Sequence, residues 1–194
     1  MARDMVQNNQ VKSKKRVADH GEVFTAEREV NAMLDLVKQE AERIDSRFLE
    51  PSCGNGNFLA EILRRKLAAV KSRYGERAAG YERHAVMAVA SVYGVELLPD
   101  NADECRKRMF EIFNSEYTAN CQYGSNDETR HKVRYILSQN IICGDFLTTK
   151  KLDGSPIEFS EWRLDGEGKL NRSKTKLEDM LEKGKEAPKR KKKT

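Results

Sequence analysis

Two glycines in the segment Glu50–Phe58 form the first chemistry-bearing pattern of the chain, which reads Glu-Pro-Ser-Cys-Gly-Asn-Gly-Asn-Phe there. Gly54 and Gly56 allow a tight turn and a close approach of the backbone to a ligand. A helix that starts beyond them offers amide donors to a carboxylate or a phosphate. A phosphate loop is not indicated, because no Gly-Lys-Ser/Thr follows, and the dinucleotide fingerprint lacks its third glycine. Taken alone, the segment is better interpreted as a glycine-rich turn without a ligand.

Three acidic residues extend this pattern, because each follows a short apolar segment that is typical of a strand. Glu50 can face an ammonium group, Glu96 can accept two ribose hydroxyls, and Asp145 can accept an exocyclic adenine amine. Each acid by itself is more typical of a surface or capping residue. Together, and in this order, they fit a cofactor that has an amino-acid end, a ribose and an adenine.

Four segments resemble the amino-methyltransferases of restriction-modification systems, particularly the modification subunits of type I enzymes. His20–Thr25 resembles the N-terminal cofactor motif of this family, and Phe48–Phe58 closely resembles its main S-adenosylmethionine motif. Gly94–Leu97 is similar to the ribose-binding strand end, and Cys143–Phe146 to the adenine-contacting motif. The first two segments are specific to the family, and the other two support them.

The resemblance covers roughly residues 19–149 and implies a Rossmann-like class I methyltransferase fold. This is an α/β fold with a mostly parallel sheet, and the chain can contain either the whole fold or only part of it. The implied cofactor is S-adenosylmethionine, and the implied reaction is methyl transfer to the adenine amino group of DNA. Ala26 replaces a usual proline, which only pre-sets the first helical turn. By this resemblance, the cofactor-binding residues are Phe24, Thr25, Glu50, Pro51, Gly54, Gly56, Glu96, Asp145 and Phe146.

The family's catalytic motif, Asn/Asp-Pro-Pro-Tyr/Phe, has no counterpart in the chain. That motif holds the target amine and stacks an aromatic ring on the flipped base. After Asp145 the only prolines are Pro156 and Pro188, which are not adjacent. Ser160-Glu161-Trp162 is a conceivable substitute, but a single Trp after an apolar run is more often a core or rim aromatic. No catalytic residue is therefore assigned.

Three interpretations of the whole chain stay open at this point. The chain can be the cofactor-binding part of a DNA adenine methyltransferase, whose partner polypeptide supplies the catalytic motif and target recognition. It can also be a non-catalytic subunit that senses the cofactor or uses the fold as a scaffold. The third interpretation is a decayed or truncated gene product.

Helices alternate with short apolar strands, which predicts an α/β fold whose parallel strands carry ligands at their carboxyl ends. Strands are expected at Arg47–Leu49, from near Ala90 through Val95, at Asn140–Cys143 and, more weakly, at Ile157–Trp162. Helices are expected from an N-cap at Thr25 to Val37, over Phe58–Leu67, up to Ala90, over Pro99–Phe113, Val133–Leu137 and Lys174–Leu181. The polar residues 114–130 are expected to form a loop or an insertion.

The net charge of +5 is concentrated at the C-terminal end of the chain. Lys183–Lys193 contains seven basic residues and one acid, so the rest of the chain is almost neutral. We expect this tail to add weak, non-specific affinity for DNA phosphates, or to be only a solvated end. The predicted units are a flexible basic arm (1–18), an S-adenosylmethionine-binding methyltransferase-like domain (19–165) and a polar extension with the lysine-rich tail (166–194).

The cysteines and the apolar stretches indicate in which cellular compartment the protein is expected. The four cysteines are scattered, without the Cys/His spacing of a metal site, and the N-terminus has no secretion pattern. The longest charge-free apolar stretch, Ala85–Val95, is too short to cross a bilayer. We therefore expect a cytoplasmic protein with reduced thiols, no membrane contact and no metal.

Overall fold

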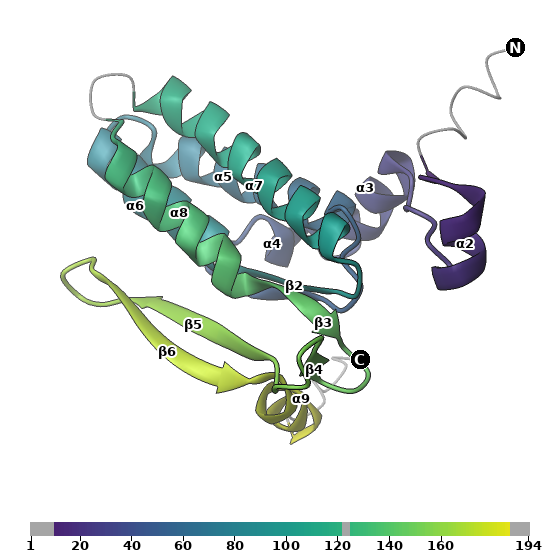
Figure 1. The fold of residues 1–194 in the computed structure, drawn as a ribbon. Coiled ribbons are helices and arrows are strands. Elements are labelled where there is room, and N and C mark those ends of the chain that lie inside the picture. The colour runs from purple at the N-terminus through teal and green to yellow at the C-terminus, as the bar shows by residue number, and fades with distance from the viewer. Residues whose placement is uncertain (1–9, 122–124, 187–194) are drawn as a thin grey trace, which may run out of the picture.

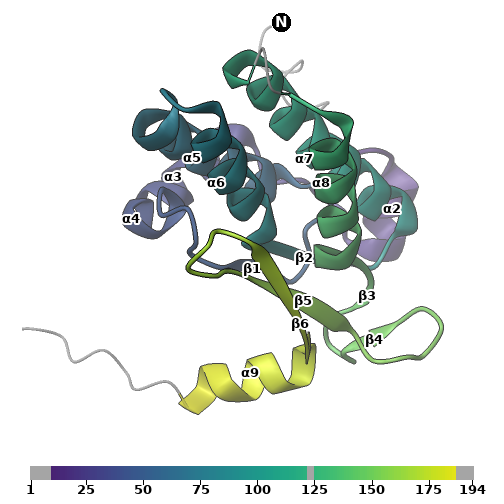
Figure 2. The ribbon, with the colours of Figure 1, turned by 90° about the vertical axis from the view of Figure 1, so that its left-hand side faces the viewer.

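Three layers make up the protein in the computed structural model, which describes residues 10–121 and 125–186 (Figure 1). A layer of long helices covers one face of a four-stranded sheet, and a β-hairpin with a helix covers the other face (Figures 1 and 2). The predicted α/β class is confirmed. None of the helices in the described ranges has the length and apolar character needed to cross a membrane.

The central sheet has the order β1-β2-β3-β4. Strands β1 (Phe48–Glu50), β2 (Val92–Glu96) and β3 (Ile141–Asp145) are parallel, as predicted, so their carboxyl ends lie at one edge of the sheet. The short strand β4 (Lys150–Lys151) was not predicted and pairs antiparallel with β3, which makes the sheet mixed. Among the described residues no strand pairs with the outer side of β1.

The helical layer connects these strands. Helices α5 (Asn57–Tyr74) and α6 (Ala78–Ala90) lie between β1 and β2, and α7 (Pro99–Asn120) and α8 (Asp127–Asn140) lie between β2 and β3. The four helices pack together around a continuous apolar core, because the buried faces of their amphipathic sequences meet there.

The expected loop at residues 114–130 is mostly helical, so that prediction was wrong. Tyr117 is fully buried one turn after Phe113, and its hydroxyl bonds to the Glu82 carboxylate. Asn126 caps the next helix by accepting a hydrogen bond from the backbone N–H of Thr129, at 2.7 Å. One buried aromatic per turn among polar residues was too weak a periodicity to predict these turns.

The second face of the sheet is covered by β5 (Glu158–Leu164), β6 (Leu170–Lys176) and α9 (Leu177–Glu186). Tyr93 and Val95 of β2 pack against Phe159 and Leu177 there. The strand expected at Ile157–Trp162 is confirmed with slightly later bounds, and the last helix begins three residues later than expected. Strand β6 was not predicted, because its residues are mostly exposed and show no apolar alternation. The domain limit expected at residue 165 falls in the turn between β5 and β6.

The N-terminal segment contains α2 (Lys14–His20), α3 (Glu27–Asp35) and α4 (Lys38–Ala41). Residues 14–18 are therefore helical rather than part of a flexible arm, and Ser13 caps them through its Oγ at 3.1 Å from the backbone N of Arg16. Residues 1–9 of that arm lie outside the described residues. Thr25 is not the N-cap of α3, because Ala26 occupies that position and makes no side-chain capping bond.

A buried lysine holds the segment before β1 against the helices. Lys66 of α5 has no exposed surface, and its Nζ donates to the carbonyls of Arg43 (2.9 Å), Ile44 (3.1 Å) and Ser46 (2.5 Å) and to Ser91 Oγ (2.9 Å). Burial lowers the pKa of Lys66 to about 7. These bonds fix the position of the residues just before β1, and β1 in turn leads into the glycine-rich segment.

Candidate functional site

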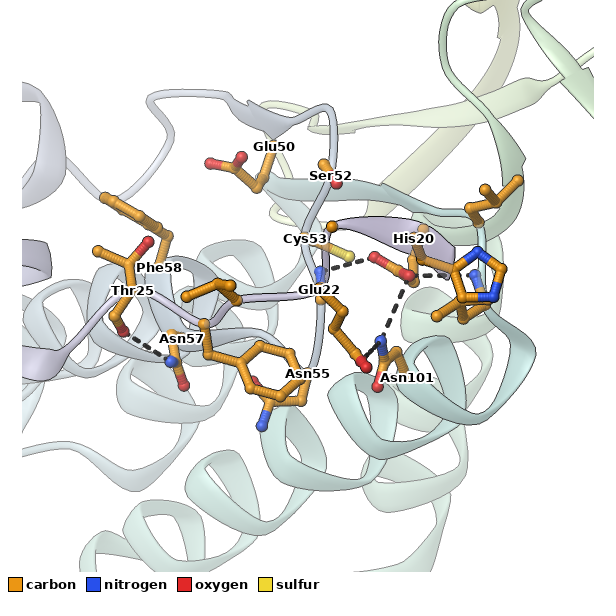
Figure 3. Close-up of a pocket in the computed structure, with 17 residues that line it drawn as sticks. His20, Glu22, Thr25, Glu50, Ser52, Cys53, Asn55, Asn57, Phe58 and Asn101 are labelled. Atoms are coloured by element: carbon orange, nitrogen blue, oxygen red, sulfur yellow. Dashed lines mark hydrogen bonds between the residues drawn. The ribbon is translucent and has the colours of Figure 1, made fainter. Parts of the chain in front are cut away.

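A pocket of about 210 Å³ lies at the carboxyl ends of β1 and β2 (Figure 3). Its wall comes from the segment before α3, from the glycine-rich segment and from the residues that lead from β2 into α7. Five of the predicted cofactor-binding residues line it: Phe24, Thr25, Glu50, Gly54 and Glu96. Three distant segments therefore meet where the strand order predicts a ligand site.

The glycine loop needs both of its glycines. Gly54 and Gly56 have φ of 53° and 88°, a region that other residues rarely adopt. A Cβ at Gly56 would lie 2.7 Å from the Cys105 sulfur, and a Cβ at Gly54 would lie 3.0 Å from the Phe24 ring. Gly56 is not among the pocket residues, so it shapes the loop from behind while Gly54 contributes to the wall.

Helix α5 points its positive end toward the pocket. The helix begins at Asn57, and its N-cap, Gly56, has no side chain that could satisfy the first amides. The first helical hydrogen bond is donated by the backbone N of Ala60, so the N–H groups of residues 57–59 are left for a partner outside the helix. Asn57 and Phe58 also line the pocket, and such a helix start favours a carboxylate or another anion.

Glu96 ties two sides of the pocket together. Its side chain is buried, and Oε2 accepts the backbone N–H of Gly54 at 2.8 Å while Oε1 accepts that of Leu98 at 3.0 Å. Asn101 also donates to Oε1, at 3.4 Å, and a carboxylate has about four acceptor sites, so these three bonds leave one for a ligand hydroxyl. Leu97 beside it is 48% exposed and gives the pocket an apolar surface.

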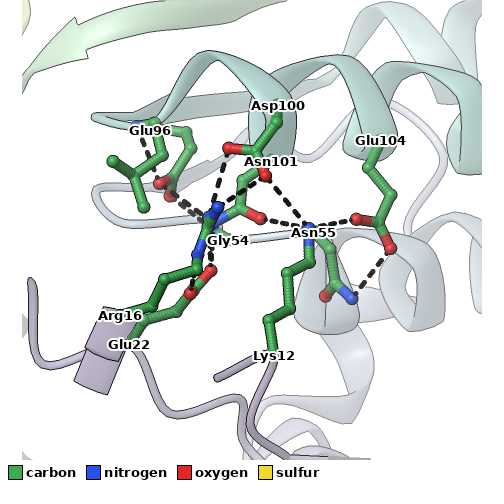
Figure 4. A network of polar contacts seen from close by, with 10 residues as sticks. Lys12, Arg16, Glu22, Gly54, Asn55, Glu96, Asp100, Asn101 and Glu104 are labelled. Atoms are coloured by element: carbon green, nitrogen blue, oxygen red, sulfur yellow. Dashed lines mark hydrogen bonds and ion pairs between the residues drawn. The ribbon is translucent and has the colours of Figure 1, made fainter. Parts of the chain in front are cut away.

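Glu22 is a pocket residue that the sequence did not single out, although it lies inside the His20–Thr25 motif. It is buried, and Arg16 and Asn101 both donate to it, Asn101 at 2.6 Å to Oε1 (Figure 4). The Arg16 guanidinium and then Asn101 hold the pKa of Glu22 below its usual range. Arg16 also bonds to Asp100 at 2.8 Å, which joins α2 to the start of α7.

Glu50 has no cationic partner among the described residues. It is partly buried, and burial raises the pKa of its carboxyl, although the backbone N–H of Ser52 opposes this. Glu22, Glu50 and Glu96 thus bring three carboxylates to a pocket that no Lys or Arg lines. Arg16 pairs with Glu22, whereas Glu50 and Glu96 have no cationic partner among the described residues, so the wall disfavours the several charges of a polyphosphate and favours a ligand with cationic and hydroxyl groups.

Three other predicted residues lie outside the pocket wall: Pro51, Asp145 and Phe146. Asp145 closes its own turn after β3, because its carboxylate accepts the Leu147 backbone N–H at 2.9 Å and the Thr148 hydroxyl at 3.0 Å. Phe146 is partly buried against the cluster that contains Tyr93 and Phe159. Pro51 is exposed at the start of the glycine loop.

Ser160 and Trp162 are buried in the core, whereas Glu161 between them is only partly buried. Trp162 is 8% exposed, and its Nε1 donates to Asn140 Oδ1 at 3.0 Å. The backbone carbonyl of Ser160 accepts the Tyr93 hydroxyl at 3.1 Å. The aromatic ring is therefore not available to stack on a base beside the pocket.

Comparison with known proteins identifies no relative: no protein-family model, no curated protein and no solved structure matches this chain. Within the described residues, no group of three or more His, Cys, Asp or Glu side chains is arranged to hold a metal ion. The function is therefore inferred from the pocket itself.

Proposed function

We propose that the pocket binds S-adenosylmethionine, and that the chain is the cofactor-binding part of a DNA adenine methyltransferase. The observation that carries the proposal is the set of three carboxylates around a glycine loop, in a pocket without Lys or Arg. Nucleotide cofactors with phosphates are disfavoured by this charge. S-adenosylmethionine instead carries a sulfonium, an ammonium and one carboxylate, and it supplies the methyl group for the reaction.

Each part of this cofactor has a counterpart among the pocket residues. Glu96 would accept a ribose hydroxyl, and Glu50 would pair with the ammonium group. The free amides at the start of α5 would bind the carboxylate. Leu97 offers an apolar surface for the adenine, whereas the carboxylate of Asp145 is engaged in its own turn, so its contact with adenine remains a prediction.

The proposed fold is half of a Rossmann-like class I methyltransferase sheet. Three parallel strands in sequential order, with acids at the ends of β1 and β2 in one pocket, support this reading. The outer side of β1 pairs with no described strand, so a strand of another chain can add beside the pocket. A partner polypeptide would bring the catalytic motif and target recognition, and the lysine-rich tail would add non-specific DNA affinity.

A second candidate is a non-catalytic subunit that senses the cofactor or acts as a scaffold. The observation that favours it is that Trp162, the aromatic residue of the conceivable substitute Ser160-Glu161-Trp162, is held in the core. Both candidates share cofactor binding. They differ in whether native complexes of the chain transfer a labelled methyl group to DNA.

Titration calorimetry tests the shared claim. S-adenosylmethionine is expected to bind, and ATP, with its phosphates, is expected not to displace it from the pocket. Glu50→Gln should weaken binding by about tenfold to a hundredfold, because a charge-assisted contact contributes about 1.5–3 kcal/mol. Asp103→Asn is the matched control, since its side chain is 74% exposed on α7 and does not line the pocket. Equal losses in both variants, or binding of ATP in place of S-adenosylmethionine, would contradict the proposal.

A further inference from the structure

A second concave surface lies at the opposite, amino end of β1. It is a groove of about 600 Å³ between the residues that precede β1, the end of α5, helix α6 and strand β5. Figure 2 shows the tip of the β5–β6 hairpin below α6 and beside β1, where these elements meet. None of the residues that line the cofactor pocket lines this groove.

Arginines give this groove a positive charge. Arg47, Arg73 and Arg163 line it, with Asp45 as the only acid. Glu161 is shared between two of these guanidiniums, at 3.2 Å from Arg47 and 3.3 Å from Arg163. Asp45 pairs with Arg43 outside the groove, at 3.5 Å.

Arg73 is exposed and forms no ion pair with the described residues. The groove therefore has more guanidinium donors than carboxylates to satisfy them. Guanidinium groups in this situation bind phosphate oxygens through paired N–H donors.

Aromatic rings lie among these arginines. Tyr74 stacks on His84 with ring centroids 3.6 Å apart and an angle of 6° between the rings. His84 Nδ1 lies 2.8 Å from the carbonyl of Gly80, which makes Nδ1 the donor and leaves Nε2 for another partner. Stacked rings beside guanidiniums are the combination with which proteins hold a base and its phosphate.

We propose that this groove binds a nucleotide unit, a phosphate with its base, either within a single-stranded nucleic acid or free. The opposite charges of the two concave surfaces separate their ligands: the acidic pocket excludes phosphates, and the arginine groove attracts them. The inference does not depend on cofactor binding, because the two sites share no residues.

The test uses the full chain and a fluorescent single-stranded oligonucleotide, with affinity measured by anisotropy. Arg73→Glu/Arg163→Glu is expected to weaken binding by about tenfold, because two phosphate contacts are lost. Arg28→Glu/Lys107→Glu changes the net charge equally at side chains that are 92% and 77% exposed, and it should weaken binding less than about twofold. Competition by AMP identifies a free nucleotide as a ligand; competition only by unlabelled oligonucleotide identifies the strand.

A local readout separates the groove from the lysine-rich tail. Photo-crosslinking of a bromouracil oligonucleotide is expected to label the peptide that contains Tyr74 or His84. If the glutamate variant does not fold, Arg73→Gln/Arg163→Gln replaces it, with an expected loss of about threefold or more. Equal losses in the groove and control variants, no loss in either, or crosslinks confined to the tail would overturn the proposal.

Discussion

Replacing Gly56 by alanine is expected to destabilise the protein in two separable ways. The first is backbone strain, because an alanine at φ 88° costs about 1–2 kcal/mol. The second is a collision, because the new Cβ would lie 2.7 Å from the sulfur of Cys105, which is fully buried. Overpacking of this kind costs about 1–3 kcal/mol. The total expected loss in the free energy of unfolding is therefore about 2–5 kcal/mol.

Cys105→Ala separates the two terms. Alone, this substitution removes one buried sulfur and should cost about 1–2 kcal/mol. In the double variant the added Cβ occupies the space that the sulfur left, so only the strain and a small packing defect remain. We expect the double variant to be more stable than the sum of the single effects by about 1–3 kcal/mol.

Urea unfolding of the four proteins in this cycle measures the coupling. Cofactor affinity should be measured on the same four proteins. The double variant should regain stability but not full affinity, because the backbone strain in the glycine loop persists. Additive effects of Gly56→Ala and Cys105→Ala would mean that a side chain at position 56 does not collide with Cys105 of α7.

Three further predictions concern charge and activity. Burial lowers the pKa of Lys66 from its ordinary value of 10.5 to about 7. Between pH 7 and pH 10.5 the Lys66 amine is therefore protonated in the unfolded chain but neutral in the folded chain, so the unfolded chain binds more protons. The stability of the native chain relative to Lys66→Met should then rise with pH by about 1 kcal/mol per unit; a difference that does not vary with pH in unfolding titrations would contradict this. Burial raises the pKa of Glu50 above its ordinary 4.5, and a cationic cofactor needs the carboxylate, so calorimetry should find affinity falling as pH is lowered through that raised pKa. Glu50→Gln should bind more weakly and without this pH dependence, and persistence of the dependence would assign it to another group. Finally, the purified chain alone should transfer no labelled methyl group to DNA, because no group positions the target amine, and transfer above the background of Gly56→Val would disprove this.

The parallel core and the glycine loop could be predicted because their signals are local. β1, β2 and β3 are short apolar segments between helical patterns, and Glu50 and Glu96 directly follow two of them. The carboxyl ends of adjacent parallel strands must meet, so two acids in one pocket follow from the order of the elements.

The remaining parts depend on contacts that the order of residues does not reveal. An acid after a strand has the same sequence signal whether it lines a pocket, as Glu50 does, or closes its own turn, as Asp145 does. Arg16 lies in a basic segment without apolar periodicity, and only packing against α7 brings it to Glu22 and Asp100. Strand β6 is held by pairing with β5 rather than by apolar alternation.

The most direct measurement is a crystal structure of the chain grown with S-adenosylmethionine. Electron density for the cofactor is expected in the pocket at the ends of β1 and β2. A ribose hydroxyl should lie within hydrogen-bonding distance of Glu96, the amino group should lie beside Glu50, and the carboxylate should face the start of α5. Cofactor bound elsewhere on the protein, or a pocket that holds only solvent at saturating cofactor, would show that this pocket is not the S-adenosylmethionine site.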